Sequence, residues 1–377
     1  MEKPFVFCFD GIIICTLSLI GASSNIFAIT VLWNRDKMIS FFHKLLISLF
    51  CIDSVVLLTS ILWNLRWSLG LKVSWLTVLY PYVILPFNHI AMTSSIFMTI
   101  GIAYERYKSR RNPIEQVQHN LQNSTSQIKR LLLYIIPILA FSTIFNIPKF
   151  LELKLIYAPS EVHKYIQNTQ GQASITTNFV ENLQHSSDMI PTWKDAILVP
   201  EIYISDFLIA NQHYLVYYYW TCVFILGVLP FTFLIFLNFH ICKSIREQNY
   251  EVTNTIDEEA SISNHNRRID EERSITKVAI VIIVVFLICH GLRTFVQMFL
   301  GACELDLQCG GVEWHPIILS LSNFFIILNS SINIVIYCIV CKTFRKDCSK
   351  TSKEWVNAIA LKQIWRTDLQ ASNNIII

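Results

Sequence analysis

The chain has 377 residues and a formal net charge of +3, and 53% of its residues are hydrophobic while only 15% are charged. A soluble domain carries about 25% charged residues, so this composition excludes an ordinary soluble globular protein and gives no sign of a nucleic-acid partner. The apolar residues also fall into blocks that match the roughly 20 residues of helix needed to cross a bilayer. We find no nucleophile, metal-binding or phosphate-loop pattern, so we expect neither enzyme activity nor a metal centre.

Seven apolar runs predict an all-α membrane protein, a bundle of seven transmembrane helices. In chain order the runs are Gly11–Trp33, Lys44–Leu65, Leu76–Tyr104, Leu131–Pro148, Tyr214–Cys242, Ile275–Leu300 and Ile317–Cys341. The basic cluster that begins at Lys342 predicts a short amphipathic helix on the inner membrane surface. We therefore expect a short extracellular N-terminus (1–10), a seven-helix domain (11–341) and a cytoplasmic tail (342–377).

The basic residues indicate the orientation of this bundle. Most of the 30 Lys and Arg lie in segments that are cytoplasmic if the N-terminus is outside. Cytoplasmic loops of membrane proteins carry an excess of Lys and Arg. The sequence therefore predicts a multi-pass plasma-membrane protein, embedded in the lipid bilayer, with an extracellular N-terminus and a cytoplasmic C-terminus.

Polar side chains lie inside several apolar runs, where they are costly and indicate function. The first run holds Asn25, the second Asp53 and the third Ser95, and the seventh holds Asn329, Ser330 and Asn333. These groups can converge on one hydrated pocket whose single carboxylate suits a hard monovalent cation or a proton. They can equally be a polar staple that hydrogen-bonds across helices.

The third run ends with Glu105-Arg106-Tyr107 at the water boundary. Glu105 can pair locally with Arg106, and Glu272 at the start of the sixth run can compete for the same guanidinium. Such an exchange would be a switch that holds two helix ends together or lets them part. The alternative is that these interfacial charges only anchor their helices.

Taken in order, these features resemble the rhodopsin-like (class A) G-protein-coupled receptors, over the span from about Gly21 to Cys348. The matching residues are Asn25, Leu49 to Asp53, Trp67 to Gly70, Glu105-Arg106-Tyr107 with Pro113, Pro230, Phe286 with Cys289, and Asn333 to Tyr337. Within that family, three segments look most like invertebrate receptors for FMRFamide-type neuropeptides: Tyr80 to Val83 with Pro86, Asn146 to Phe150, and Asn329 to Asn333.

The resemblance implies that an extracellular, RF-amide-like neuropeptide binds the chain and that a heterotrimeric G protein, and then arrestin, binds its cytoplasmic face. It places an allosteric sodium ion, the sole cofactor expected, at a polar core of Asn25, Asp53, Ser95, Asn329 and Asn333. It places the G-protein coupling switch at Glu105, Arg106, Tyr107, Glu272 and Tyr337. Three residues fall on its connector between ligand pocket and cytoplasmic opening: Ile96, Pro230 and Phe286.

Positional analogy also places eight residues along the ligand pocket: Trp63, Asn88, His89, Met92, His290, Arg293, Gln297 and Asn323. For each of them the alternative is packing against lipid or against the core. The outside segments are net negative, which favours a cationic ligand.

Some family positions are substituted. Pro81 stands where most members carry a cysteine, and the outside loop from Lys149 to His213 has no Cys, so we expect no hairpin pinned there by the usual disulfide. His290, Leu292 and Ile334 replace a Trp and two prolines of the family. These departures keep two alternatives open: a receptor-like protein that has lost coupling, and a transporter or channel that uses the Asp/Asn cluster.

Three cysteines carry separate predictions. Cys303 and Cys309, in the last outside loop, can close a small disulfide ring in an oxidising exterior or remain free thiols. Cys348, beside the basic cluster of the tail, can be palmitoylated or be an ordinary cysteine.

Overall fold

The computed structural model describes residues 2–33, 41–71, 73–111, 124–159, 198–207, 211–254, 262–305, 315–342 and 344–357. Within these ranges, seven helices are long and apolar enough to cross a membrane: Pro4–Trp33, Phe41–Trp67, Ser74–Arg111, Ser126–Phe145, Trp220–Ser244, Thr276–Val296 and Ile317–Val340. The predicted seven-helix bundle is thereby confirmed.

Several spans are built from more than one helical segment. The first joins α1 (Glu2–Val6), the π-helix η1 (Phe7–Ile14) and α2 (Cys15–Trp33), the second is α3 (Phe41–Trp67), and the third joins α4 (Ser74–Leu79), the π-helix η2 (Tyr80–Ile84) and α5 (Leu85–Arg111). The fourth is α7 (Ser124–Phe145), which is followed by the short 3-10 helix η3 (Ile147–Phe150).

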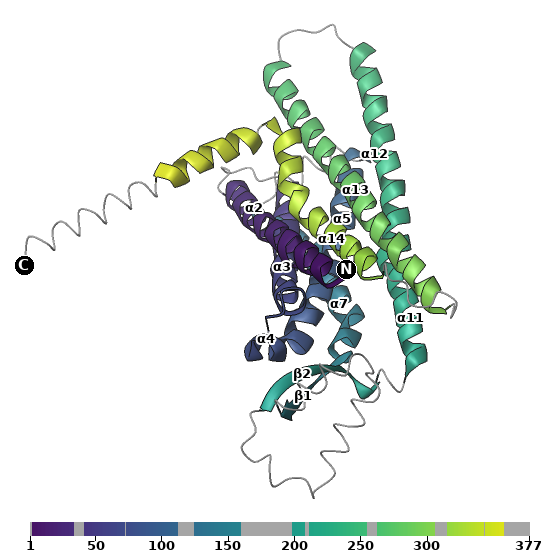
Figure 1. The fold of residues 1–377 in the computed structure, drawn as a ribbon. Helices are drawn as coiled ribbons and strands as arrows, with labels where there is room; N and C mark the ends of the chain where they lie inside the picture. The colour runs from purple at the N-terminus through teal and green to yellow at the C-terminus, as the bar shows by residue number, and fades with distance from the viewer. Residues whose placement is uncertain are drawn as a thin grey trace, which may run out of the picture.

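After the strands β1 (Leu153–Pro159) and β2 (Leu198–Ile204), the fifth span joins α11 (Gln212–Cys222), the π-helix η5 (Val223–Val228) and α12 (Leu229–Asn254). The sixth is α13 (Ile262–Leu305) and the seventh is α14 (His315–Val340). Figure 1 shows the helices side by side, with the two strands at one end of the bundle and long extensions of α12 and α13 at the other.

The outer faces of the bundle carry large apolar side chains. On α7, for example, Leu133, Ile136 and Ile144 are 73%, 58% and 67% exposed. In water such surfaces would be unfavourable, whereas in a bilayer they face lipid tails. The exposed apolar belt therefore agrees with a multi-pass membrane protein.

The largest buried apolar cluster joins α2, α3, α5, α13, α14 and the helical residues after α14. Leu45, Phe50, Met98, Tyr337 and Phe344 are all completely buried in it. Because lipid tails are as apolar as these side chains, close packing rather than exclusion of water holds such helices together. The cluster therefore fixes one end of the bundle, beside the Glu105-Arg106-Tyr107 segment.

The first helical span begins before its predicted start at Gly11. The residue just before the predicted start is Asp10. In the structure Asp10 is only 8% exposed, and its Oδ2 accepts a hydrogen bond of 2.7 Å from Ser320 Oγ on α14. Phe9 packs on Phe324 of the same helix, with 5.7 Å between ring centroids. Contacts with α14 therefore extend the first helix back toward Glu2.

A hairpin without a disulfide covers one end of the bundle. Strands β1 and β2 pair in antiparallel register from Leu153↔Ile204 to Pro159↔Leu198. Leu153 and Ile202 also pack on an apolar cluster of the second and third spans that includes Tyr80. A hairpin is thus present although the usual disulfide is not, because backbone hydrogen bonds and apolar contacts hold the two strands.

The predicted helix after the last span is present at residues 344–357. Phe344 is buried and meets the ring of Tyr337 edge-on at 4.6 Å, and Trp355 meets Phe27 of α2 at 5.4 Å. Arg345 and Lys346 are exposed. The helix therefore turns aromatic side chains toward the bundle and basic ones outward, as an amphipathic helix on a membrane surface does.

Gly21 allows the first and seventh helices to approach closely, which gives a testable prediction. A methyl group on Gly21 would lie 2.7 Å from Ser331 Cβ and 3.0 Å from Leu57 Cδ1. We expect Gly21→Ala to destabilise the purified protein, because about 2 kcal/mol of overpacking exceeds the gain of about 1 kcal/mol in helix propensity. Thermal unfolding in detergent micelles measures this.

Gly101→Ala is the matched control, because its methyl group would come no closer than 3.5 Å to a neighbour, Tyr134 Cδ1. It should leave the unfolding temperature unchanged or slightly raised. Equal losses in both variants would show that close packing at Gly21 is not the cause.

Candidate functional site

A polar cluster around Asp53 joins the second, third and seventh spans. Asp53 is completely buried, and its Oδ1 accepts hydrogen bonds from Ser95 Oγ at 2.6 Å and Ser330 Oγ at 3.1 Å. Its Oδ2 accepts one from Asn333 Nδ2 at 2.7 Å. Both carboxylate oxygens are therefore engaged by donors from two other helices.

The remaining members of the predicted polar core lie less directly on Asp53. Asn25 donates from Nδ2 to the backbone oxygen of Ser330 at 3.0 Å, so it attaches the first span to the same cluster. Asn329 is buried on α14, but no hydrogen bond joins it to Asp53 among the described residues. Ser330, rather than Asn329, contacts the Asp53 carboxylate. It lies three residues before Asn333, a spacing that puts both side chains on one helix face.

The atoms around Asp53 are suitable ligands for a hard monovalent cation. A hydroxyl group that donates a hydrogen bond keeps lone pairs on its oxygen, so Ser95 and Ser330 can each offer an oxygen beside the carboxylate. Carboxylate, hydroxyl and amide oxygens are the ligand types that hard cations take. These residue types fit the sodium ion that the resemblance implied, and Asp53, Ser95 and Ser330 would hold it.

Near the C-terminal end of α5, Glu105 has a different partner from the predicted Arg106. Arg130 Nη2 of α7 lies 2.8 Å from Glu105 Oε1 and 3.0 Å from Oε2, and Tyr134 donates to Oε2 at 2.9 Å. The Glu105 side chain is 2% exposed. Glu105 thus ties the third span to the fourth, where the sequence predicted a local pair with Arg106. The Glu272 side chain lies outside the described residues.

A row of aromatic side chains connects Arg106 to Tyr337. The guanidinium of Arg106 lies 4.0 Å from the ring centroid of Phe42, which is buried in α3. Phe42 meets His43 at 6.0 Å, and His43 meets Tyr337 of α14 at 6.4 Å, both edge-on. Two residues of the predicted switch, one on the third span and one on the seventh, are therefore linked through the second.

Two residues of the predicted connector share one buried cluster. Ile96 and Phe286 are each 1% exposed and pack with Leu234 and Leu237 of α12. Pro230 is buried near the start of α12, directly after the π-helix η5. The connector thus joins the third, fifth and sixth spans through side-chain packing.

His290 stands where the family carries a tryptophan, and it keeps an aromatic contact with the connector. Its ring stacks on Phe286 with 4.1 Å between centroids and 22° between planes. His290 is 4% exposed. The substitution therefore preserves stacking in the middle of the sixth span.

The predicted ligand residues divide into groups with different partners. Arg293 donates from Nη1 to Met92 Sδ at 2.9 Å, which joins the sixth and third spans. Asn88 instead donates to Thr59 Oγ1 at 2.8 Å and Ser60 Oγ at 3.1 Å, so it is a staple between α5 and α3.

The other predicted ligand residues have fewer recorded contacts. Trp63 packs edge-on against Tyr80 at 5.4 Å, and His89 and Asn323 are half-buried. The side chain of Gln297 lies outside the described residues.

The cysteine predictions are only partly covered. Cys309 and the side chain of Cys303 lie outside the described residues. Cys348 is half-buried, and its thiol hydrogen-bonds that of Cys338. Burial raises the pKa of the Cys348 thiol to about 12, and the Cys338 thiol adds to the shift. The thiolate is the reactive form of cysteine, so this environment lowers the reactivity of Cys348, and palmitoylation there stays a prediction.

Sequence reasoning named Ser330 among the polar residues that could converge on Asp53, and the structure places its hydroxyl on that carboxylate. It missed two residues, Arg130 and Tyr134, that contact Glu105. Arg130 and Tyr134 lie four residues apart at the start of the fourth span, a spacing that places them on one helix face. That spacing was the available signal, although it does not name the partner.

Comparisons with known proteins agree with this geometry. The sequence model of the 7 transmembrane receptor (rhodopsin family) matches residues 204–337. The FMRFamide receptor of Drosophila melanogaster is 22% identical over 343 residues, which are 89% of this chain and 52% of that protein. The B1 bradykinin receptor of Homo sapiens is 30% identical over 152 residues, which are 38% of this chain and 40% of that protein.

The chain therefore spans about half the length of the fly receptor, or less for the human one. The family match agrees with the seven membrane-length helices and the buried polar core. The chain is therefore similar to seven-transmembrane receptors of the rhodopsin family.

Proposed function

We propose that this protein is a G-protein-coupled receptor that binds an extracellular neuropeptide of the RF-amide type and transmits the binding to a cytoplasmic heterotrimeric G protein. The observation that carries the proposal is the similarity to an FMRFamide receptor along 89% of the chain. The second relative is also named as a receptor for a peptide. The excess of basic residues on one side of the bundle supports an extracellular N-terminus and a cytoplasmic C-terminus.

In this proposal the ligand shifts an equilibrium between closed and open cytoplasmic faces, which requires that it bind the open state better. Opening of the cytoplasmic face would break the contact between α5 and α13 in which Arg110 Nη2 donates to Thr276 Oγ1 at 2.9 Å. The row from Arg106 to Tyr337 lies in the same part of the bundle. Parting α13 from α5 would then expose a surface for the G protein.

We include a sodium ion in the proposal, held by Asp53, Ser95 and Ser330. A bound cation would neutralise the buried carboxylate and hold the second, third and seventh spans together. Any ligand that favours a different arrangement of these helices would then bind less tightly when sodium is present, because coupling between two sites is reciprocal.

The comparisons favour this receptor over a transporter or channel, because both relatives are receptors. The stacking of His290 on Phe286 argues against a receptor-like protein that has lost G-protein coupling, because it preserves an aromatic contact at a substituted position.

The test is to add a library of RF-amide peptides to intact cells that express the protein and to record second messengers. We expect at least one peptide to give a response that Arg106→Ala abolishes at equal surface expression. Lys350→Ala is the control, because Lys350 is exposed on the tail helix and should keep the response. A response that survives Arg106→Ala would show that the proposed switch is wrong. An ion current in cells without the G protein would show that the protein is a channel and not a receptor.

A further inference from the structure

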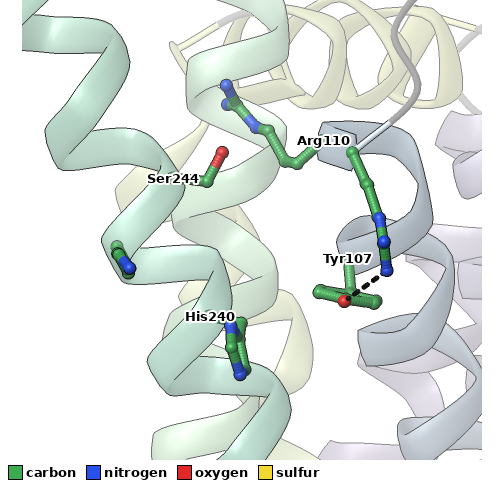
Figure 2. Close-up of a pocket in the computed structure, with 6 residues that line it drawn as sticks. Tyr107, Arg110, His240 and Ser244 are labelled. Atoms are coloured by element: carbon green, nitrogen blue, oxygen red, sulfur yellow. Dashed lines mark hydrogen bonds between the residues drawn. The ribbon is translucent and has the colours of Figure 1, made fainter.

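A small pocket lies between the third and fifth spans, beside the Glu105-Arg106-Tyr107 segment. Its volume is about 210 Å³, and it is lined by Tyr107, Arg110, Arg111, His240, Lys243 and Ser244. Figure 2 shows Tyr107 and Arg110 on α5 facing His240 and Ser244 on α12. Two helices that are distant in sequence therefore build the pocket together.

The lining of this pocket is strongly basic. Arg110, Arg111 and Lys243 are permanent cations at neutral pH, and none of the six lining residues, all within the described part of the chain, is acidic. Tyr107 and Ser244 add hydroxyl groups, and Arg111 Nη1 donates to the Tyr107 hydroxyl at 3.3 Å. Guanidinium groups bind phosphate through paired charge-assisted hydrogen bonds. The chemistry that suits the pocket is therefore a phosphate ester with more than one negative charge.

An apolar surface adjoins the pocket on α12. Ile235, Phe236 and Phe239 are 52%, 53% and 66% exposed. The rings of Phe236 and Phe239 contact His240 at 4.5 Å and 5.8 Å, so the lipid-facing side of α12 leads directly to the pocket. A soluble phosphate would gain nothing from this surface, whereas a lipid could lay its acyl chains along it.

We propose that the pocket binds the phosphorylated headgroup of an inner-leaflet phosphoinositide, with the acyl chains on the exposed apolar face of α12. The proposal rests on the orientation given above, which places this end of the bundle in the cytoplasm. Basic clusters at the cytoplasmic ends of membrane helices recognise such headgroups. Because Arg110 also bonds Thr276 of α13, the bound lipid touches the contact between the third and sixth spans.

The test measures lipid retention by the purified full-length protein, without peptide or G protein, so its failure is distinct from failure of the receptor function. The protein is placed in phosphatidylcholine nanodiscs that contain phosphatidylinositol bisphosphate, and retained lipid is read by native mass spectrometry. We expect the double variant Arg111→Gln/Lys243→Gln to weaken retention roughly tenfold or more. Both side chains are exposed, so the fold should survive.

The matched control is Arg345→Gln/Lys346→Gln, which removes the same charge from exposed positions on the tail helix. It should retain the lipid as the wild type does, and an equal loss would overturn the pocket in favour of diffuse positive charge. Equal retention of charge-matched phosphatidylserine would overturn it as well.

A further arm offers soluble inositol trisphosphate or inorganic phosphate as competitors. The proposal expects these to displace the lipid only weakly, and equal competition would assign the pocket to a soluble phosphate instead. If the pocket variant keeps the lipid but lowers G-protein activation, the pocket serves a protein partner and the lipid proposal is wrong.

Discussion

Replacing Asp53 with alanine is expected to destabilise the folded protein by about 3 kcal/mol. The change leaves Ser95, Ser330 and Asn333 as buried donors without their acceptor, at about 1 kcal/mol for each interhelical hydrogen bond. The loss should appear as a lower unfolding temperature of the purified protein in detergent micelles. An unchanged temperature would mean that this cluster contributes no stability.

Asp53→Asn separates the charge from the hydrogen bonds, because the amide keeps the shape and one acceptor oxygen. The wild type should unfold at a higher temperature in sodium chloride than in choline chloride at equal ionic strength. The asparagine variant should show no such difference, since it lacks the carboxylate that neutralises the ion. If it stays sensitive to sodium, the ion binds elsewhere.

The second large effect is expected at the ion pair between Glu105 and Arg130. In Arg130→Ala the Glu105 carboxylate, whose side chain is 2% exposed, keeps the Tyr134 hydroxyl as a hydrogen-bond donor but loses its cationic partner. An unpaired buried charge costs about 3 kcal/mol or more. The variant also loses the guanidinium that lies 4.3 Å from the ring centroid of Phe41. We expect a clear loss of stability in thermal unfolding.

The double variant Glu105→Gln/Arg130→Ala tests the cause. Removing the negative charge should recover part of the stability, so the double variant should unfold at a higher temperature than Arg130→Ala alone. If the loss of stability in the double variant equals the sum of the losses in Glu105→Gln and Arg130→Ala, the two residues are not coupled. The arginine would then matter only through its packing.

The sequence predicted the helices well because a bilayer demands long apolar runs, and such runs are visible without any tertiary information. The first helix shows the limit of this reasoning. The predicted run begins just after Asp10, yet the Asp10 carboxylate is buried in the bundle and accepts a hydrogen bond from the Ser320 hydroxyl on α14. Which polar residues a helix can bury depends on the neighbour that it meets, and a single chain segment does not contain that information.

The site residues could be predicted from the sequence to the same extent as the helices. Asp53 and Asn333 were predicted together because both lie deep within apolar runs, and the structure joins them at 2.7 Å. The partner of Glu105 was missed because neighbours in sequence, such as Arg106, point in different directions from a helix. Helix rotation decides that Glu105 faces Arg130 while Arg106 faces Phe42.

At the other end of the bundle, rotation also decides whether a polar side chain faces a ligand or another helix. Asn88 was placed in the ligand pocket by analogy, but its amide is used by Thr59 and Ser60. Position along a helix can be taken from the sequence, whereas the direction of the side chain cannot.

The outer strands have a practical consequence. The cysteines whose side chains the structure describes are free thiols, and the pairing of β1 with β2 involves none of them. Folding of this cap therefore needs no oxidase or isomerase, and reducing agents should leave it intact. The protein can therefore be produced in a bacterial cytosol or a cell-free extract, where disulfides rarely form, as far as folding of this hairpin is concerned.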